Sequence, residues 1–241
     1  MATQARRCGP VSALGASHTI EVAGATLVAD CAGALYWPEQ RLLAVADLHL
    51  EKGSAFAARG VLLPPYDTAT TLLLLGHLIT RYAPRLVVAL GDSFHDGGGP
   101  ARMAPRDRAA LGALQRGRDW LWIAGNHDPE PAVGIGGRFA PSLSMGPLVF
   151  RHEPRADPAP GEIAGHLHPV ARIARRGRTV ARRCFAADRQ RIVMPAFGAY
   201  TGGLNVRHGA FAEVFASLRF TAHMLGDSRL YAIAATHCLP G

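Results

Sequence analysis

The sequence predicts an α/β protein with two β-sheets, and three observations support this fold class. Short apolar runs recur along the chain and end in polar clusters, which is typical of buried strands. Helical patterns alternate with these runs in the first half, which favours strands covered by helices. After Pro169 the apolar runs follow one another closely, which predicts mostly antiparallel strands that complete a second sheet.

The amino-acid composition is that of a globular protein. Apolar residues make up 49% of the 241 residues, which is enough to fill a sizeable core, and we expect one domain over residues 1–241. Charged residues are only 18%, which argues against disorder over most of the chain. The 27 glycines and 17 prolines favour many turns and short strands over a helical bundle.

Five apolar runs lead directly into polar motifs. Strands that end at a common edge of a fold would bring these motifs together. The runs and motifs, in chain order, are residues 42–46 before Asp47-Leu48-His49, residues 86–90 before Gly91-Asp92, residues 120–124 before Gly125-Asn126-His127-Asp128, residues 148–150 before His152, and residues 163–164 before Gly165-His166-Leu167-His168.

Two helices are expected between the first three runs. Asp67 precedes a leucine-rich stretch that ends at Tyr82, shortly before Pro84, and this pattern predicts an N-capped helix. Residues 105–116 predict a second helix with proline in its first turn. The strands expected after Pro169 are residues 170–173, 179–185, 192–194 and 230–233.

The formal charge of +8 favours polyanionic partners through sequence-independent attraction. Lys52 is the only lysine, so the excess is almost entirely arginine, which an arginine-biased composition would also produce. Six arginines lie within residues 172–183. This stretch either contacts a nucleic-acid backbone or forms a solvated strand face, and the sequence leaves both readings open.

The cysteines and the apolar segments bear on location. Cys8, Cys31, Cys184 and Cys238 form no C-x-x-C pair, so neither a zinc ribbon nor a dense disulfide framework is expected. No apolar run reaches membrane-spanning length, and no signal-peptide core follows Arg6 and Arg7. We therefore expect a cytoplasmic protein without a membrane partner.

The polar motifs together supply the ligands of a two-metal site. Such a hydrolase needs oxygen and imidazole ligands, with one carboxylate shared by both metals. Asp47 and His49 would leave an extended backbone on the same side. Asp92 and Asn126 each follow a glycine, where close backbone approach is needed. Each signal is weak alone, and their joint occurrence in this order is what predicts a metal centre.

At these residues the sequence resembles the calcineurin-like metallophosphoesterase signature over roughly residues 42–170. The resemblance implies a sandwich of two mixed β-sheets flanked by helices, with two divalent metal ions at the strand ends. It implies a metal-activated water as nucleophile. The roles that it implies are Asp47, His49 and His168 for the first metal, Asn126, His152 and His166 for the second, Asp92 as the bridge, His127 as the group that stabilises or protonates the leaving oxygen, and Asp128 as the residue that orients the His127 ring.

The match departs from the family pattern in two places. Protein phosphatases of the superfamily carry Asp-Arg-Gly after the Gly-Asp pair, whereas this chain continues as Ser93-Phe94-His95-Asp96. A phosphoprotein substrate is therefore disfavoured. Glu153 follows His152, where the family often has glycine or a second histidine.

A narrower resemblance is to the bacterial PdeM family of ligase-associated DNA damage response endonucleases. It rests on Lys52-Gly53-Ser54-Ala55-Phe56, Arg59-Gly60, the stretch from Leu63 to Thr68 and the Gly-Asp-Ser-Phe-His-Asp run. It implies a phosphodiesterase or nuclease in DNA repair, encoded with an ATP-dependent DNA ligase, a helicase and an exonuclease. His95, just beyond the bridging aspartate, and Arg59 are the expected substrate-binding residues.

Oxygen and imidazole ligands without thiolate suit Mn, Fe or Zn, and we expect Mn²⁺. Two alternatives to a repair nuclease remain at this point. One is hydrolysis of small cyclic nucleotides or other small phosphodiesters. The other is a non-catalytic repair scaffold, against which the intact set of ligands argues.

Overall fold

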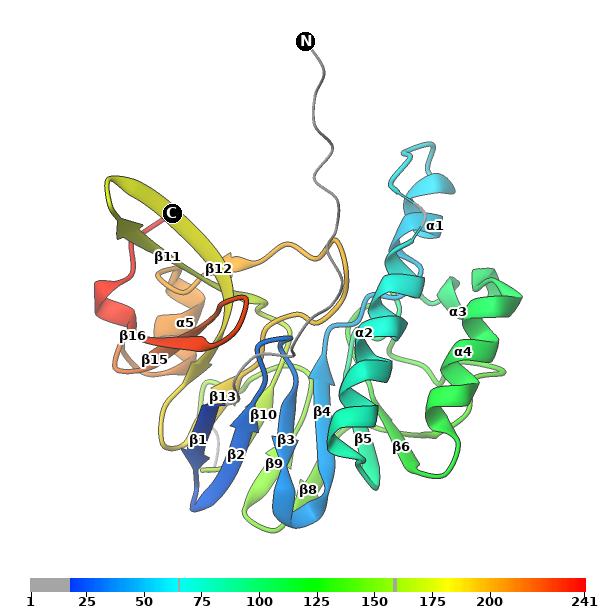
Figure 1. Ribbon diagram of the computed structural model, residues 1–241, viewed down its shortest axis with the longest axis horizontal. Coiled ribbons are helices and arrows are strands. Elements are labelled where there is room, and N and C mark those ends of the chain that lie inside the picture. Colours follow the sequence, from blue (N-terminus) through cyan, green and yellow to red (C-terminus); the bar gives the residue numbers. More distant parts are fainter. Residues whose placement is uncertain (1–17, 65, 158–159) are drawn as a thin grey trace.

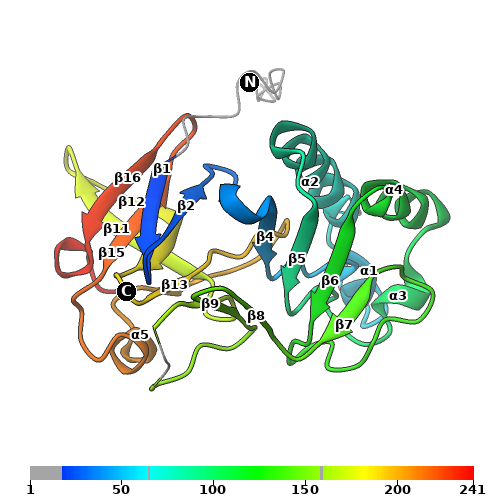
Figure 2. The same ribbon diagram turned by 90° about the horizontal axis from the view of Figure 1, so that it is seen from below.

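The computed structural model describes residues 18–64, 66–157 and 160–241. Arg6, Arg7, Cys8 and Pro65, which entered the sequence analysis, lie outside the described residues. Within the described part of the chain, two β-sheets pack face to face, and helices cover the outer face of the first sheet (Figures 1 and 2). None of the helices found there is long and apolar enough to cross a membrane.

The first sheet contains seven strands whose spatial order follows the sequence. Neighbouring strands from β1 to β4 pair antiparallel, and neighbouring strands from β4 to β7 pair parallel. The strands are β1 (His18–Val22), β2 (Ala25–Ala29), β3 (Leu35–Trp37), β4 (Leu42–Ala46), β5 (Leu86–Leu90), β6 (Asp119–Ile123) and β7 (Arg138–Ala140).

The second sheet is also mixed and contains nine strands. Its main order is β14-β11-β12-β13-β10-β9-β8, and β15 and β16 branch from β12. The strands are β8 (Leu143–Met145), β9 (Leu148–Phe150), β10 (Glu162–Ala164), β11 (Pro169–Arg175), β12 (Arg178–Ala187), β13 (Arg191–Val193), β14 (Leu204–Asn205), β15 (Thr221–Leu225) and β16 (Leu230–Ala234).

The helices are short apart from two. The longer ones, α2 (Asp67–Tyr82) and α4 (Pro105–Gln115), lie beside β5 and β6 in Figure 2. The others are α1 (Lys52–Ala57), α3 (Gly99–Arg102), α5 (Gly209–Val214) and the 3-10 turns η1 (Pro38–Gln40) and η2 (Ala235–His237).

Strand β4 shows how the sequence produces these layers. All five of its residues are buried, because each face of the strand packs on a different layer. Leu42 and Ala44 belong to the core between the two sheets, whereas Leu43 and Val45 pack with Leu75 of α2. A continuous apolar run is therefore required at this position, in place of an alternating one.

The expected fold class is confirmed, including the two mixed sheets with flanking helices. The N-cap expected at Asp67 was wrong. Asp67 is the first residue of α2, its N-cap position is occupied by Tyr66, and no side chain caps the helix. The Asp67 carboxylate instead accepts a hydrogen bond from the Gly53 N–H at 2.9 Å, because the chain of α1 packs against the start of α2.

Candidate metal centre

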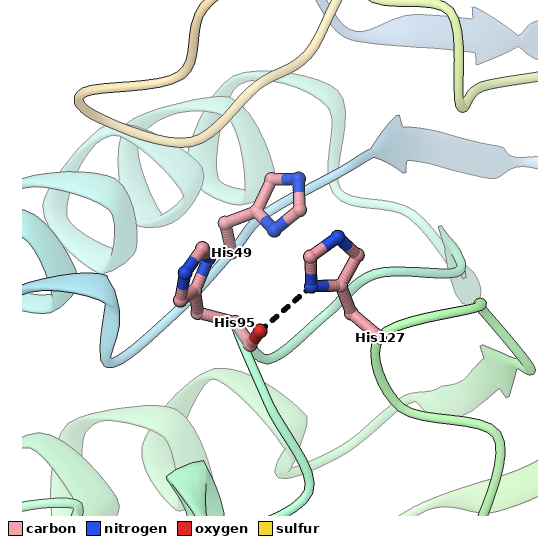
Figure 3. Close-up of side chains that lie close together, drawn as sticks. All are labelled: His49, His95 and His127. Atoms are coloured by element: carbon pink, nitrogen blue, oxygen red, sulfur yellow. Dashed lines mark hydrogen bonds between the residues drawn. The ribbon is translucent and has the colours of Figure 1, made fainter. Parts of the chain in front are cut away.

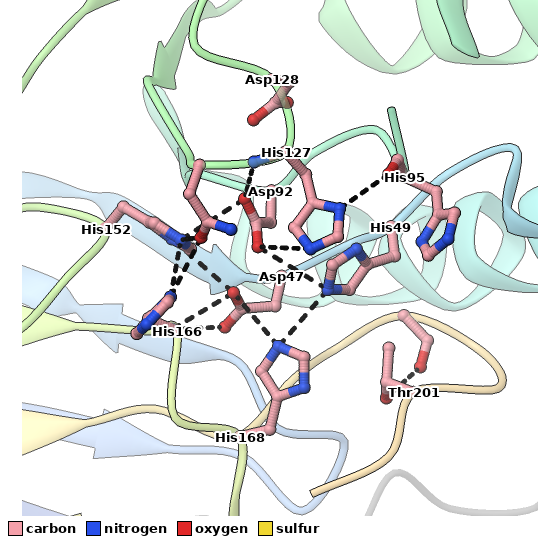
Figure 4. Close-up of polar contacts among 12 residues, drawn as sticks. Asp47, His49, Asp92, His95, His127, Asp128, His152, His166, His168 and Thr201 are labelled. Atoms are coloured by element: carbon pink, nitrogen blue, oxygen red, sulfur yellow. Dashed lines mark hydrogen bonds and ion pairs between the residues drawn. The ribbon is translucent and has the colours of Figure 1, made fainter. Parts of the chain in front are cut away.

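The polar motifs meet at one edge of the two sheets, beyond the ends of β4, β5, β6, β9 and β10 (Figure 4). A parallel bridge between Ala46 and Ala196 joins the two halves of the fold there. Eight side chains predicted from the sequence gather at this edge: Asp47, His49, Asp92, Asn126, His127, His152, His166 and His168.

The backbone at this edge is left-handed at several non-glycine residues. Asp47 and His49 have φ angles of 52° and 42°, and Asp92 has 45°. His166 and His168 have 67° and 46°. The extended backbone expected at Asp47 and His49 is therefore incorrect. Non-glycine residues rarely adopt this conformation, and such strain is concentrated at functional sites.

Two glycines allow the loops to approach closely, as their position before polar residues suggested. A Cβ atom on Gly91 would lie 2.4 Å from the His152 ring. A Cβ atom on Gly125 would lie 2.1 Å from the backbone nitrogen of Asp92. Any side chain at either position would displace the polar groups of the site.

A first group consists of Asp47, His49 and His168, whose ligand atoms lie close enough together to hold one metal ion. His168 Nε2 lies 3.3 Å from Asp47 Oδ1 and 3.4 Å from His49 Nε2. Asp47 is fully buried, and its carboxylate also accepts a hydrogen bond from the His166 N–H. This bond ties the loop after β4 to the loop after β10.

A second group consists of Asp92, His152 and His166, with Asn126 beside them. His152 Nε2 lies 2.8 Å from Asn126 Oδ1 and 3.2 Å from His166 Nδ1. His166 Nδ1 lies 3.1 Å from the same amide oxygen. Three ligand atoms thus converge on a volume the size of one ion.

Asp92 lies between the two groups. Its Oδ1 is 3.4 Å from His152 Nε2, and its Oδ2 is 3.9 Å from His49 Nε2. The carboxylate is held in place by the His127 N–H, which donates to Oδ1 at 2.9 Å. One carboxylate therefore faces both groups with different oxygen atoms.

The residues at this edge fit two divalent cations. Ring nitrogens of different histidines point at one another and at carboxylate oxygens, an arrangement that a cation between them would satisfy. The donors are oxygen and imidazole nitrogen, with no thiolate among the described groups, which suits Mn, Fe or Zn.

His127 lies beside both groups: its ring is 5.1 Å from that of His49, and with His49 and His95 it forms a further cluster whose nitrogens lie close enough together to hold an ion. Its Nδ1 donates a hydrogen bond to the backbone carbonyl of His95 at 2.8 Å, so the ring is oriented with Nε2 free (Figure 3). Nε2 lies 4.0 Å from Asp92 Oδ2. The ring is more than one-third exposed, which allows contact with a substrate.

Asp128 does not orient the His127 ring as the family pattern suggested. Its Oδ2 accepts hydrogen bonds from the N–H groups of Ser93 and Phe94, at 2.8 and 3.0 Å. Asp128 therefore fixes the loop that carries Asp92. The His95 carbonyl, in place of Asp128, orients the His127 ring. Burial raises the pKa of Asp128 to about 6, and the two N–H donors only partly oppose this.

The electrostatics of the two groups differ. Burial lowers the pKa of His49 to about 3, despite the nearby charge of Asp92. Burial also acts against the charged form of His152, but the hydrogen bond to Asp92 and the charge of Asp47 outweigh it and raise the pKa to about 9. The same His152 contact overcomes burial at Asp92 and lowers the pKa of that carboxyl to about 2.

The two expected substrate-binding residues lie on the side of the first group. The His95 ring is 5.6 Å from that of His49 and 5.4 Å from that of His127, measured between centroids. Burial and then the charge of Lys52 lower the pKa of His95, and Arg59 acts in the same direction. Arg59 itself is exposed in the turn after α1.

The basic stretch lies on the hairpin formed by β11 and β12 (Figure 1). Five of its six arginines are exposed. Arg183 is half-buried and donates a hydrogen bond to the Ala196 carbonyl at 2.6 Å, so it serves the fold.

Sequence reasoning missed the loop of residues 198–203, which lies against the first group. The Gly198 N–H donates to the Asp47 carbonyl, and Thr201 donates to the Gly198 carbonyl (Figure 4). A Cβ atom on Gly198 would lie 2.0 Å from the Leu48 carbonyl oxygen. The signal that could have revealed this loop is the glycine-rich run Gly198-Ala199-Tyr200-Thr201-Gly202-Gly203 after an apolar strand.

Two mixed sheets with clustered aspartate and histidine side chains at one edge form a candidate binuclear metal site. The chain belongs to the calcineurin-like phosphoesterase family, whose model matches residues 40–178. The family uses a binuclear divalent metal site.

The chain is also similar to a solved nuclease. The crystal structure of Pseudomonas putida nuclease MPE superimposes with a TM-score of 0.67 and 29% sequence identity. The match covers 90% of this chain and 100% of that one. A comparison with curated proteins found no match.

Proposed function

We propose that this protein is a Mn²⁺-dependent phosphodiesterase that acts as a nuclease in DNA repair. Its family and its nuclease relative make it a metal-dependent hydrolase. The finer assignment to nucleic acid draws support from the Pseudomonas putida nuclease. A repair role beside a DNA ligase, a helicase and an exonuclease follows only from the resemblance to the PdeM family.

The observation that carries the proposal is the position of Asp92. Its two oxygens face His49 on one side and His152 on the other. A shared carboxylate is what two cations need in order to act on one water. In this proposal Asp47, His49 and His168 hold the first cation, Asn126, His152 and His166 hold the second, and Asp92 bridges them.

The bound cations would supply a nucleophilic water and would offset negative charge on the phosphate. The protein's own contribution is positioning and proton transfer. Because Nδ1–H of His127 is donated to the His95 carbonyl, Nε2 is the ring nitrogen that faces the leaving oxygen, and the imidazolium form of the ring gives that oxygen its Nε2 proton. Asp128 keeps the Asp92 loop in place through Ser93 and Phe94. His95 and Arg59 contact the substrate on the side of the first group.

A second candidate function uses the same chemistry on small cyclic nucleotides or other small phosphodiesters. The chain lacks the arginine that protein phosphatases carry in the stretch after the Gly-Asp pair, and this absence is compatible with either substrate class. The two candidates differ in substrate length, which can be measured directly.

The test is a panel of substrates presented to the Mn-loaded protein: single-stranded DNA, duplex DNA, RNA, cyclic nucleotides and bis-p-nitrophenyl phosphate. We expect cleavage of bis-p-nitrophenyl phosphate and of DNA. Hydrolysis confined to cyclic nucleotides would move the assignment to the second candidate. Loss of all activity on adding a chelator, and its return with Mn²⁺, is the control for metal dependence.

A further inference from the structure

A cavity of about 550 Å³ adjoins the second ligand group. Asn126 and His152 line it, together with Arg151, Glu153 and Arg155 of the loop after β9. A substrate whose scissile phosphate lies at the metal centre would therefore extend into this cavity. None of the sequence motifs pointed to the two arginines.

The cavity carries positive charge. Arg151 Nε lies 3.4 Å from the carboxylate of Glu162, and Arg191 lies 3.5 Å from its other oxygen. The lining of the cavity holds two arginines, Arg151 and Arg155, and one carboxylate, that of Glu153. Among the described residues no carboxylate lies within ion-pair distance of the Arg155 guanidinium, which is exposed.

The backbone of Arg155 is fixed on both sides. Its N–H donates to Glu162 at 3.1 Å, and its carbonyl accepts from Arg191 at 2.8 Å. Glu162 and Arg191 are both buried, so they form a rigid support under an exposed cationic side chain. The backbone that carries the guanidinium is therefore fixed beside the cavity, and a guanidinium is suited to bidentate contact with a phosphate.

We propose that this cavity binds the phosphate adjacent to the scissile one in a polynucleotide, with Arg155 as its main contact. This inference rests on the proposed function and deepens it, because a flanking phosphate exists in a nucleic-acid strand and not in a small diester. Arg151 contributes positive charge from the wall of the cavity. Arg155 acts in substrate binding and takes no part in bond cleavage.

The test compares the thymidine dinucleotide TpT with the same dinucleotide carrying one terminal phosphate, pTpT or TpTp. We expect the wild-type protein to show a kcat/KM about fivefold to tenfold higher for one phosphorylated form, through a lower KM. Arg155→Gln should reduce this preference to less than about twofold, because it removes the charge that binds the phosphate. Its backbone contacts and its activity on bis-p-nitrophenyl phosphate should remain.

Arg189→Gln is the matched control, because Arg189 is also exposed but lies in the turn before β13 and is not among the residues that line the cavity. It should retain the preference. A preference that survives Arg155→Gln, or no preference in the wild-type protein, would overturn the subsite while leaving the phosphodiesterase assignment intact. Failure of the wild-type protein to hydrolyse any of the diesters would overturn both.

Discussion

The two sheets bring different chemistry to the edge where they meet. The first sheet contributes both aspartates and the asparagine, together with His49, whereas the second contributes only histidines: His152, His166 and His168. Each proposed ligand group draws on both sheets. The centre as proposed is therefore complete only where the two sheets pack together. Metal binding should therefore stabilise the contact between the sheets.

The largest expected effect tests the residue shared between the two groups. Asp92→Asn should abolish hydrolysis, because an amide lacks the negative charge that faces both groups. We expect metal analysis to find fewer than two equivalents of Mn bound. Asp119→Asn is the control, since Asp119 is exposed at the start of β6, and it should behave as wild type. Two equivalents retained by Asp92→Asn would contradict a bridging carboxylate.

The next largest effect is expected on the reaction rate of a His127 variant, because His127 is proposed to transfer a proton and not to bind a metal ion. His127→Ala should bind both metals and fold normally, yet lose about a hundredfold to ten-thousandfold in rate on DNA, whose leaving alkoxide needs a proton. The loss should be smaller with bis-p-nitrophenyl phosphate, because p-nitrophenolate leaves without one. Equal losses on both substrates would remove the acid role, and loss of metal would show that His127 is a ligand.

A smaller effect is expected on thermal stability, because bound cations would join the two sheets. Mn²⁺ at about 100 times its dissociation constant should stabilise the fold by about 2.7 kcal/mol, if the unfolded chain binds none. For a chain of this size that corresponds to a rise in Tm of about 5 to 10 °C, measured by thermal unfolding with and without chelator. The rise should shrink in Asp92→Asn. An identical Tm with and without metal would mean that the cations do not join the sheets.

The smallest effect uses a histidine of the second sheet that lies away from the metal edge. Burial, and then the charge of His18, lower the pKa of His223 to about 4. Because the folded-state pKa lies below that of the unfolded chain, His223 contributes stability above about pH 6.5 that is lost as the pH falls toward 4. His223→Phe should flatten this part of the curve of Tm against pH. An unchanged curve would assign the acid sensitivity to other groups.

Much of the fold could be predicted where the strands are buried on both faces. Residues 42–46 and 86–90 are continuous apolar runs, and they coincide with β4 and β5. The leucine-rich stretch of α2 was equally clear. The hairpin of β1 and β2 was missed, although its buried and exposed residues alternate. It packs on segments distant in sequence, and no polar motif marks it.

The residues at the metal edge could be predicted because each motif is contiguous in sequence and follows a strand. Their contacts could not. The partner of His127 is the His95 carbonyl, and that of Asp128 is the Ser93 and Phe94 backbone, in each case a main-chain group with no sequence signal. Arg155 had no sequence signal for a similar reason, because its backbone is held by Glu162 and Arg191, which begin β10 and β13, away from its own loop.

The left-handed backbone at Asp47, His49, Asp92, His166 and His168 has a consequence for the evolution and engineering of the protein. Each such residue costs on the order of 1 kcal/mol or more, which glycine would largely avoid. A search for variants that are thermostable in the absence of metal should therefore recover glycine at these positions, and those variants would lose the ligands. Stability and activity are in conflict at this edge, and screening for thermal stability alone would select inactive protein.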